Sequence, residues 1–310
     1  MTAPALRVAL VGFGKIAHDQ HLPAIAADPA FALAAVVDPA VSHDVGVPVF
    51  PSLGELLASD CAVDALSICT PPQIRRALAQ EAIEAGKHVL LEKPPCAVIS
   101  AVAALEEQAL KAGVSLFAAW HSRYAAGVEP AKHWLAGREI REVRIDWRED
   151  VRVWHPGQHW IWQAGGFGVF DPGINALSIA TAILPRPLCI RRGVLKVPAN
   201  CETPVAASLA LEDSAGLPVS VELDFLQTGP QTWDIAVDTD GGTMVLSEGG
   251  SVLTTPEGEI RAPDREYPAI YAHFAQTIRE GRSEVDVAPL RLVADAFMRC
   301  RIEQVAPFHE

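Results

Sequence analysis

The first 120 residues alternate between short, almost wholly apolar runs and more mixed segments. Short apolar runs are typical of parallel strands that are buried on both faces. The expected strands are residues 6–11, 31–37, 63–69, 88–91 and 114–119, with helices at 72–85 and 100–112. Pro72 suits the first position of a helix, Ser100 an N-cap, and Gly86 the residue just after a helix. This β-α-β-α-β order predicts a doubly wound parallel sheet.

The pattern changes after about residue 120. Apolar and charged residues partly alternate over 140–147, which indicates a strand with one solvated face. The further expected elements are a helix at 171–184, strands at 190–197, 207–211, 219–225, 233–237, 243–246 and 252–254, and helices at 268–280 and 289–304. Strands in series predict an α+β domain with a large, mostly antiparallel open sheet. We expect two domains, residues 1–120 and 121–310, with the last helix packing on the first domain.

Composition restricts the class of protein. Half of the 310 residues are hydrophobic and a fifth are charged, so a large core is expected and two domains fit the length. The formal net charge of −13 argues against nucleic acid or an anionic membrane as a partner, because phosphates are neutralised by clustered Lys and Arg. The six cysteines form no C-x-x-C pair, so neither disulfides nor a zinc site are expected. No signal peptide or membrane span is expected, and we predict a soluble cytoplasmic protein.

A glycine-rich turn follows the first expected strand. Residues 12–17 match G-x-G-x-x-A, in which the first glycine permits a tight turn and the second lets the backbone approach a pyrophosphate. The second strand ends in Asp38, where a carboxylate would bond the ribose 2′-hydroxyl of NAD. The same carboxylate would repel the 2′-phosphate of NADP, so NAD is the expected cofactor, although His43 leaves NADP use open.

The expected strand at 88–91 ends in a charged, proline-rich turn. It is followed by Glu92, Lys93, Pro94 and Pro95. Ligands of open α/β sheets bind at the carboxyl ends of the strands, so we expect Lys93 to face the cofactor. The two prolines stiffen the backbone there. A surface turn with an exposed Lys–Glu pair is the alternative.

These motifs resemble the glucose–fructose oxidoreductase and inositol dehydrogenase family (Gfo/Idh/MocA) over the whole chain. The residues that carry the resemblance are 11–17, 92–94, 120–123, 154–158, 165–168 and 170–175. Three of these segments are similar to the branch of bacterial aldose 1-dehydrogenases that act on L-arabinose and D-galactose. The resemblance implies oxidation of the C1 hydroxyl of a free sugar to the lactone, with hydride transfer to NAD(P)⁺. It also implies a homo-oligomer, a dimer or larger.

Many members of this family carry Asp and His four residues apart on the helix after the glycine-rich run. This chain has Asp171 and Asn175 instead, and residues at this spacing face the same side of a helix. Asparagine cannot accept a proton at neutral pH, so the base must lie elsewhere. Lys93 is the leading candidate and Asp171 the competing one, and a relay between them is a third option. Asp171 also precedes Pro172, where an N-cap aspartate is expected on structural grounds alone.

Tryptophan and histidine side chains gather in the stretch 154–162. Aromatic rings pack against the C–H faces of sugars, and imidazole, amide and carboxylate groups bond to hydroxyls. The expected sugar contacts are His121, Glu149, Trp154, His155 and Trp233. His159 and Trp160 fit core packing equally well. No metal site is expected, because no H-x-x-x-H pair or carboxylate triad accompanies the imidazoles.

The expected catalytic and cofactor-binding residues complete the prediction. The catalytic residues are Lys93, Asp171 and Asn175. The cofactor contacts are Gly12, Phe13, Gly14, Lys15, Ile16, Asp38, Cys69, Thr70, Pro71, Gln73, Glu92, Lys93 and Trp162. Two other functions stay open: oxidation of another ring hydroxyl of a sugar or polyol, and a non-catalytic NAD(H)-binding regulator. Retention of Lys93 and Asp171 argues against the regulator.

Overall fold

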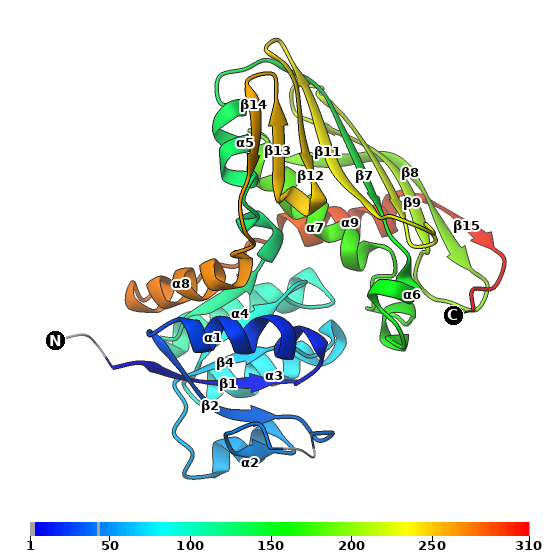
Figure 1. The fold of residues 1–310 in the computed structure, drawn as a ribbon. Coiled ribbons are helices and arrows are strands. Elements are labelled where there is room, and N and C mark those ends of the chain that lie inside the picture. The colour runs from blue at the N-terminus through cyan, green and yellow to red at the C-terminus, as the bar shows by residue number, and fades with distance from the viewer. Residues whose placement is uncertain (1–3, 42–43, 310) are drawn as a thin grey trace. The chain divides into compact units, whose positions relative to one another are not determined.

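A computed structural model describes residues 4–41 and 44–309 of the protein (Figure 1). The chain forms two compact units. The first contains the residues up to Trp120 together with Tyr267–Asp286, and the second contains His121–Glu266 and the residues from Val287 onward. Among the described residues, no helix combines the length and the apolar character that a membrane span requires.

The first unit is built on a six-stranded parallel sheet with the order β3-β2-β1-β4-β5-β6. Its strands are β1 (Leu6–Val11), β2 (Phe31–Val37), β3 (Val49–Phe50), β4 (Ala65–Ile68), β5 (His88–Glu92) and β6 (Leu116–Ala119). All of β4 and all but the first residue of β5 are buried, which explains why these strands are continuous apolar runs in the sequence. The predicted doubly wound parallel sheet is confirmed.

Helices cover both faces of this sheet. They are η1 (Ala17–His21), a π-helical turn that runs into α1 (Leu22–Ala27), then α2 (Leu53–Ala58), α3 (Pro72–Glu84), α4 (Ile99–Ala112) and α8 (Glu266–Arg279). Pro72 is the first residue of α3, and Gly86 follows that helix in a left-handed conformation, as predicted. The expected N-cap at Ser100 is wrong. Helix α4 begins one residue earlier, and Val98 precedes it in an extended conformation.

The second unit is built on a nine-stranded sheet with the order β14-β13-β12-β11-β7-β10-β9-β8-β15. Its strands are β7 (Ile140–Arg148), β8 (Leu188–Pro198), β9 (Ala206–Asp213), β10 (Pro218–Asp224), β11 (Thr232–Thr239), β12 (Gly242–Ser247), β13 (Val252–Thr255), β14 (Gly258–Arg261) and β15 (Arg301–Val305). The pairs β7–β10 and β8–β15 are parallel, and the other neighbours are antiparallel. The predicted large, mostly antiparallel sheet is confirmed.

The helices α5, α7 and α9 lie on one face of the nine-stranded sheet (Figure 1). The helical elements of this unit are η2 (His121–Tyr124), α5 (Val128–Leu135), α6 (Val151–Trp154), η3 (His159–Trp162), α7 (Phe170–Ile183), η4 (Glu248–Gly250) and α9 (Ala288–Arg299). Val143 and Ile145 of β7 are buried and Arg144 between them is exposed, which accounts for the alternating pattern in the sequence.

One expectation for the C-terminal part of the chain is wrong. Residues 301–304 were expected to extend the last helix, but they form β15, because this segment pairs with the edge strand β8. The last helix, α9, packs on α7 and β8 of the second unit. The helix that joins the first unit is α8, where Tyr271 and Phe274 pack against Phe31.

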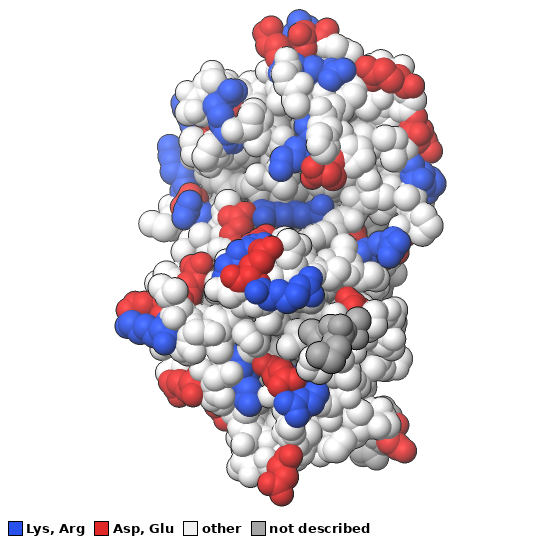
Figure 2. Space-filling view, turned by 90° about the vertical axis from the view of Figure 1, so that its left-hand side faces the viewer, with Lys and Arg blue, Asp and Glu red and all other residues white. Residues whose placement is uncertain are grey.

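Charged side chains are mixed on the surface. Figure 2 shows one face of the molecule, on which acidic and basic side chains are interspersed among uncharged ones. The described part of this face therefore carries no extended basic surface of the kind that binds nucleic acid.

Candidate functional site

The turn after β1 has the geometry that a dinucleotide requires. Gly12 has a φ of +84°, and a Cβ there would lie 2.8 Å from Cγ2 of Thr70, so only glycine fits. A Cβ on Gly14 would meet nothing within 4 Å in the described part of the chain. This open space lets a phosphate group approach the main chain at the start of the following helix. The turn therefore fits a bound dinucleotide.

Asp38 follows β2 and reaches back to this turn. Its Oδ2 accepts a hydrogen bond from the Phe13 N–H at 2.7 Å, and its Oδ1 accepts one from the Ala40 N–H at 2.8 Å. The carboxylate is thus fixed at the strand end where such folds bind the adenosine ribose. Lys15, also predicted as a cofactor contact, forms an exposed ion pair with Asp19. His43 lies outside the described residues.

The predicted cofactor contacts after β4 lie in the loop that starts α3. Cys69, Thr70 and Pro71 form this loop, and Gln73 lies in the first turn of the helix. The hydroxyl oxygen of Thr70 is buried and has no hydrogen-bond partner in the described part of the protein. Buried polar atoms are nearly always paired, so this oxygen calls for a ligand group or a water molecule.

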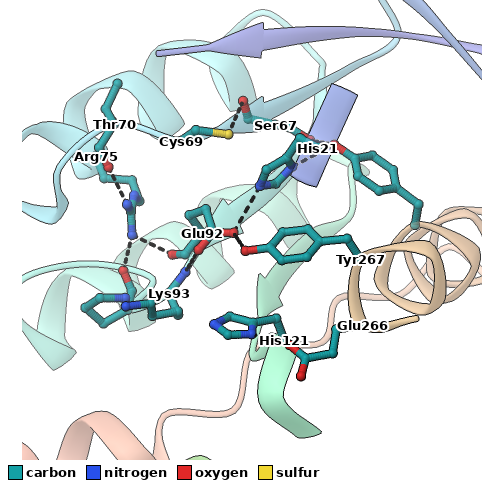
Figure 3. A network of polar contacts seen from close by, with 12 residues as sticks. His21, Ser67, Cys69, Thr70, Arg75, Glu92, Lys93, His121, Glu266 and Tyr267 are labelled. Carbon is teal, nitrogen blue, oxygen red and sulfur yellow. Dashed lines mark hydrogen bonds and ion pairs between the residues drawn. The ribbon is translucent and has the colours of Figure 1, made fainter. Parts of the chain in front are cut away.

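The main chain around Lys93 is held on both sides (Figure 3). Oε2 of Glu92 accepts a hydrogen bond from the Lys93 N–H at 2.8 Å. The buried guanidinium of Arg75 donates to the carbonyl oxygens of Glu92 and Pro94, and also to that of Thr70. Glu92 is only 3% exposed. The alternative of an exposed Lys–Glu surface turn is therefore wrong.

Glu92 lies in a buried group of hydrogen-bonding side chains that the sequence analysis missed. Oε1 of Glu92 accepts a hydrogen bond from the Tyr267 hydroxyl at 2.7 Å and lies 3.0 Å from Nε2 of His21. The hydroxyl of Tyr271 lies 2.9 Å from Nδ1 of His21 and 2.8 Å from Oγ of Ser67. We call these five residues the Glu92 network. No local pattern marks them, because they come from η1, β4, β5 and α8.

Protonation of His21 is favoured by this environment. Although burial alone would lower it, the neighbouring Cys69, Tyr271 and Glu92 groups raise the pKa of His21 well above its ordinary value. In the protonated ring both nitrogens donate, which matches the oxygen atoms of Glu92 and Tyr271 on either side.

A second group of predicted residues meets around Glu149 in the second unit. Glu149 follows β7 and is 3% exposed. Its Oε1 lies 3.0 Å from Nε2 of His155, and its Oε2 accepts a hydrogen bond from the Trp233 indole at 2.9 Å. The Trp233 ring lies edge-on to Trp154, with ring centres 4.9 Å apart, and stacks with Trp147. Glu149, Trp154, His155 and Trp233 thus form one cluster, as a shared sugar site requires.

Asp171 joins this cluster through His155. It is the second residue of α7 and is buried, and its Oδ2 lies 3.8 Å from Nδ1 of His155. This is ion-pair distance but too long for a hydrogen bond. The N-cap residue of α7 is Val169, which makes no side-chain cap hydrogen bond, so Asp171 does not occupy the N-cap position. Asn175 lies one turn further along α7 and is half-buried.

Two predicted residues have other neighbours. Nδ1 of His121 lies 2.5 Å from Oε2 of Glu266 (Figure 3). Trp162 packs against Phe225 and Phe308, and its indole N–H is buried with no hydrogen-bond partner among residues 4–41 and 44–309. Over the same residues, no group of three His, Cys, Asp or Glu side chains is arranged to hold a metal ion.

The parallel sheet, the glycine turn and the carboxylate after β2 define a protein with an NAD-binding type of Rossmann domain. Residues 6–119 match the family model described as an oxidoreductase family with an NAD-binding Rossmann fold. The chain is 49% identical to galactose 1-dehydrogenase of Pseudomonas fluorescens over 295 residues, which cover 94% of this chain and 95% of that one. It belongs to the Gfo/Idh/MocA family of oxidoreductases.

Other relatives agree with this assignment. The crystal structure of a D-galactose-1-dehydrogenase protein from Rhizobium etli has a TM-score of 0.94 and 51% identity, and the match covers 100% of this chain and 99% of that one. D-xylose 1-dehydrogenase (NADP(+)) 2 of Haloferax volcanii is 27% identical over 230 residues, which cover 71% of this chain and 68% of that one.

Proposed function

We propose that the protein is an aldose 1-dehydrogenase. It oxidises the C1 hydroxyl of D-galactose, of L-arabinose, or of both to the lactone, with NAD⁺ preferred and NADP⁺ a possible second cofactor. The two relatives named as galactose 1-dehydrogenases, at 49% and 51% identity over nearly the whole chain, support the reaction and the sugar class. The observation that carries the proposal is the buried Glu149 carboxylate, which faces His155 and Trp233 in a wall of tryptophan rings.

The chemistry of this cluster suits a sugar. Trp154 is 40% exposed, which is unusual for a large aromatic ring and leaves a face free for the C–H surface of a pyranose. Glu149 and His155 supply an acceptor and a donor for sugar hydroxyls. L-arabinose and D-galactose share their ring configuration and differ in the group on C5, so a site that reads the ring hydroxyls accepts both.

Oxidation at C1 needs a group that takes the proton from the C1 hydroxyl. A bound nicotinamide would supply the hydride acceptor. We propose Lys93 and Asp171 for the proton, since the Lys93 main chain is held by Glu92 and the buried Asp171 carboxylate lies beside His155. The imidazole of His155 lies beside the Asp171 carboxylate, with Nδ1 3.8 Å from Oδ2.

The cofactor preference follows from Asp38. A carboxylate fixed by two main-chain N–H groups is oriented for a ribose hydroxyl and repels a 2′-phosphate. The relative from Haloferax volcanii is named for NADP⁺, which supports testing NADP⁺ as a second cofactor. As the family resemblance implies, we also propose a homo-oligomer, which light scattering of the purified protein tests.

A panel of sugars tests the proposed reaction. D-galactose, L-arabinose, D-glucose and D-xylose are each offered with NAD⁺ and NADP⁺, and methyl β-D-galactoside serves as a matched control that lacks a free C1 hydroxyl. We expect cofactor reduction with D-galactose or L-arabinose and none with the glycoside. Reduction with the glycoside would mean that another ring hydroxyl is oxidised. NADH binding without turnover of any sugar would indicate a regulator.

A further inference from the structure

The main chain at Lys93 is held by side chains rather than by strand pairing alone. The Lys93 N–H donates to Oε2 of Glu92 at 2.8 Å, and Arg75 donates to the carbonyl oxygens of the residues before and after Lys93. This N–H and the two carbonyl groups therefore all form hydrogen bonds with ionisable side chains. Hydrogen bonds to charged groups are shorter and stronger than neutral ones, so this arrangement fixes the direction in which Lys93 leaves β5.

Glu92 can hold Lys93 only if it is itself held. It is buried, and a buried carboxylate is costly unless it is paired and hydrogen-bonded. The Tyr267 hydroxyl donates to its Oε1 at 2.7 Å, and Nε2 of His21 lies 3.0 Å from the same atom. One carboxylate oxygen thus faces Tyr267 and His21, and the other faces the main chain of Lys93.

Net stability alone does not explain why the chain keeps this polar arrangement. Buried ion pairs contribute little to stability, and replacing them with apolar side chains of the same volume is often neutral or stabilising. Apolar packing is available on both sides, because Tyr267, Tyr271 and Phe274 of α8 are almost fully buried against the sheet. The five residues of the Glu92 network are buried, and Glu92 connects them to the main chain of Lys93, which is half-buried.

We propose that His21 and Tyr267 are positioning residues that act through Glu92 to hold Lys93 in its working orientation. Helix α8 lies far along the chain but belongs to the first unit, and through Tyr267 it supplies one of the groups that hold Glu92. The effect on turnover rests on the proposed function, in which Lys93 handles the proton. The effect on the Lys93 main chain does not depend on that function.

Tyr267→Phe is the sharpest test, because it removes one hydroxyl and keeps the ring. Thr277→Val is the matched control: it removes another buried hydroxyl from α8, one that donates to the carbonyl of His273 within the same helix. Two measurements are made on the whole protein. The first is the rate of hydrogen exchange at the Lys93 amide. The two following residues, Pro94 and Pro95, carry no amide hydrogen and so add no exchange signal of their own. Kinetics with the best aldose give kcat, and NADH titration gives the Kd.

In Tyr267→Phe we expect faster exchange at Lys93, a loss of about tenfold to a hundredfold in kcat, and an unchanged Kd for NADH. The control should match the wild type in all three. A second pair of variants, at His21, guards against misreading a folding defect. His21→Leu should show the same loss of kcat. His21→Gln, which again places a donor near Glu92, should recover part of that kcat.

Exchange and kcat that are the same in Tyr267→Phe and Thr277→Val would overturn the proposal. Failure of the positioning proposal can be told apart from failure of the proposed function. If the wild type oxidises no aldose, the proposed function fails, while the exchange experiment still decides whether Glu92 and its neighbours hold Lys93.

Discussion

Nδ1 of His155 lies 3.8 Å from Oδ2 of Asp171. The sequence suggested that this chain lacks a histidine beside that aspartate, because Asn175 stands four residues further along α7. The structure brings an imidazole to Asp171 from a different segment, the residue that follows α6. The other ring nitrogen of His155 faces Glu149, so one imidazole joins the predicted catalytic carboxylate to the predicted sugar-binding one.

Lys93 is predicted to be essential for turnover. Lys93→Met should lower kcat by about a hundredfold or more, the scale of lost acid–base help, and should leave NADH binding nearly unchanged. Steady-state kinetics and an NADH titration measure the two effects. Lys111→Met, which removes an exposed lysine on α4, is the control. Turnover near the wild-type value in Lys93→Met would remove this residue from the mechanism.

The indole N–H of Trp233 is predicted to orient Glu149 for the sugar. Trp233→Phe keeps an aromatic ring but removes the donor to Oε2, so KM for the sugar should rise about tenfold to a hundredfold, the range expected for one lost hydrogen bond to a charged group. Trp134→Phe is matched to it, because the Trp134 indole donates to Glu257 at 2.7 Å on the surface of the same unit. If Trp233→Phe keeps the wild-type KM, as Trp134→Phe should, the Trp233 indole does not orient Glu149 for the sugar.

Asp38 is predicted to set the cofactor preference. Asp38→Ser removes the charge that would repel a 2′-phosphate, and a like-charge contact costs several kcal/mol, so kcat/KM for NADP⁺ relative to NAD⁺ should rise by at least about tenfold. The comparison of kcat/KM for both cofactors in wild type and variant is the measurement. A wild type that clearly prefers NADP⁺ would contradict this view of Asp38.

The stability of the protein is predicted to depend on pH through His21. Its pKa in the folded protein lies well above the ordinary value, since the surrounding groups outweigh the effect of burial. A raised pKa stabilises the fold fully below about pH 6.5, and the contribution is lost as the pH rises toward the folded-state pKa, by at most about 1.4 kcal/mol per pH unit.

Denaturant unfolding of the wild type and of His21→Gln between pH 6 and pH 9 measures this contribution. The wild type's advantage in free energy of unfolding should shrink as the pH rises. His88, whose pKa is lowered by burial, is present in both proteins and cancels in the difference. A difference that stays constant over this range would show that His21 is not protonated in the fold.

The sequence predicted elements where local pattern and burial agree. Most strands of both sheets were found because they are apolar runs or alternate, and the glycine turn was found because the main chain needs Gly12 there. Strands β3, β14 and β15 were missed, and β3 has only two residues. All four residues of β14 are exposed and those of β15 are exposed or half-buried, so neither shows an apolar face.

The members of the Glu149 cluster were predictable residue by residue, but their contacts with one another were not. Glu149, His155 and Trp233 were named from their chemistry, yet the sequence does not say that one carboxylate joins the other two. Tyr267 and His21 carry no signal of their own in the sequence, because the role of each depends on a partner far along the chain.

Transfer of the hydrogen on C1 tests the central claim most directly. The protein is incubated with NAD⁺ and D-galactose that carries deuterium at C1 only, and the reduced cofactor and the sugar product are analysed by mass spectrometry and NMR. An aldose 1-dehydrogenase yields reduced nicotinamide that carries the deuterium, together with galactonolactone or its hydrolysis product. Reduced cofactor without deuterium, with the label retained on the sugar, would contradict the proposed function.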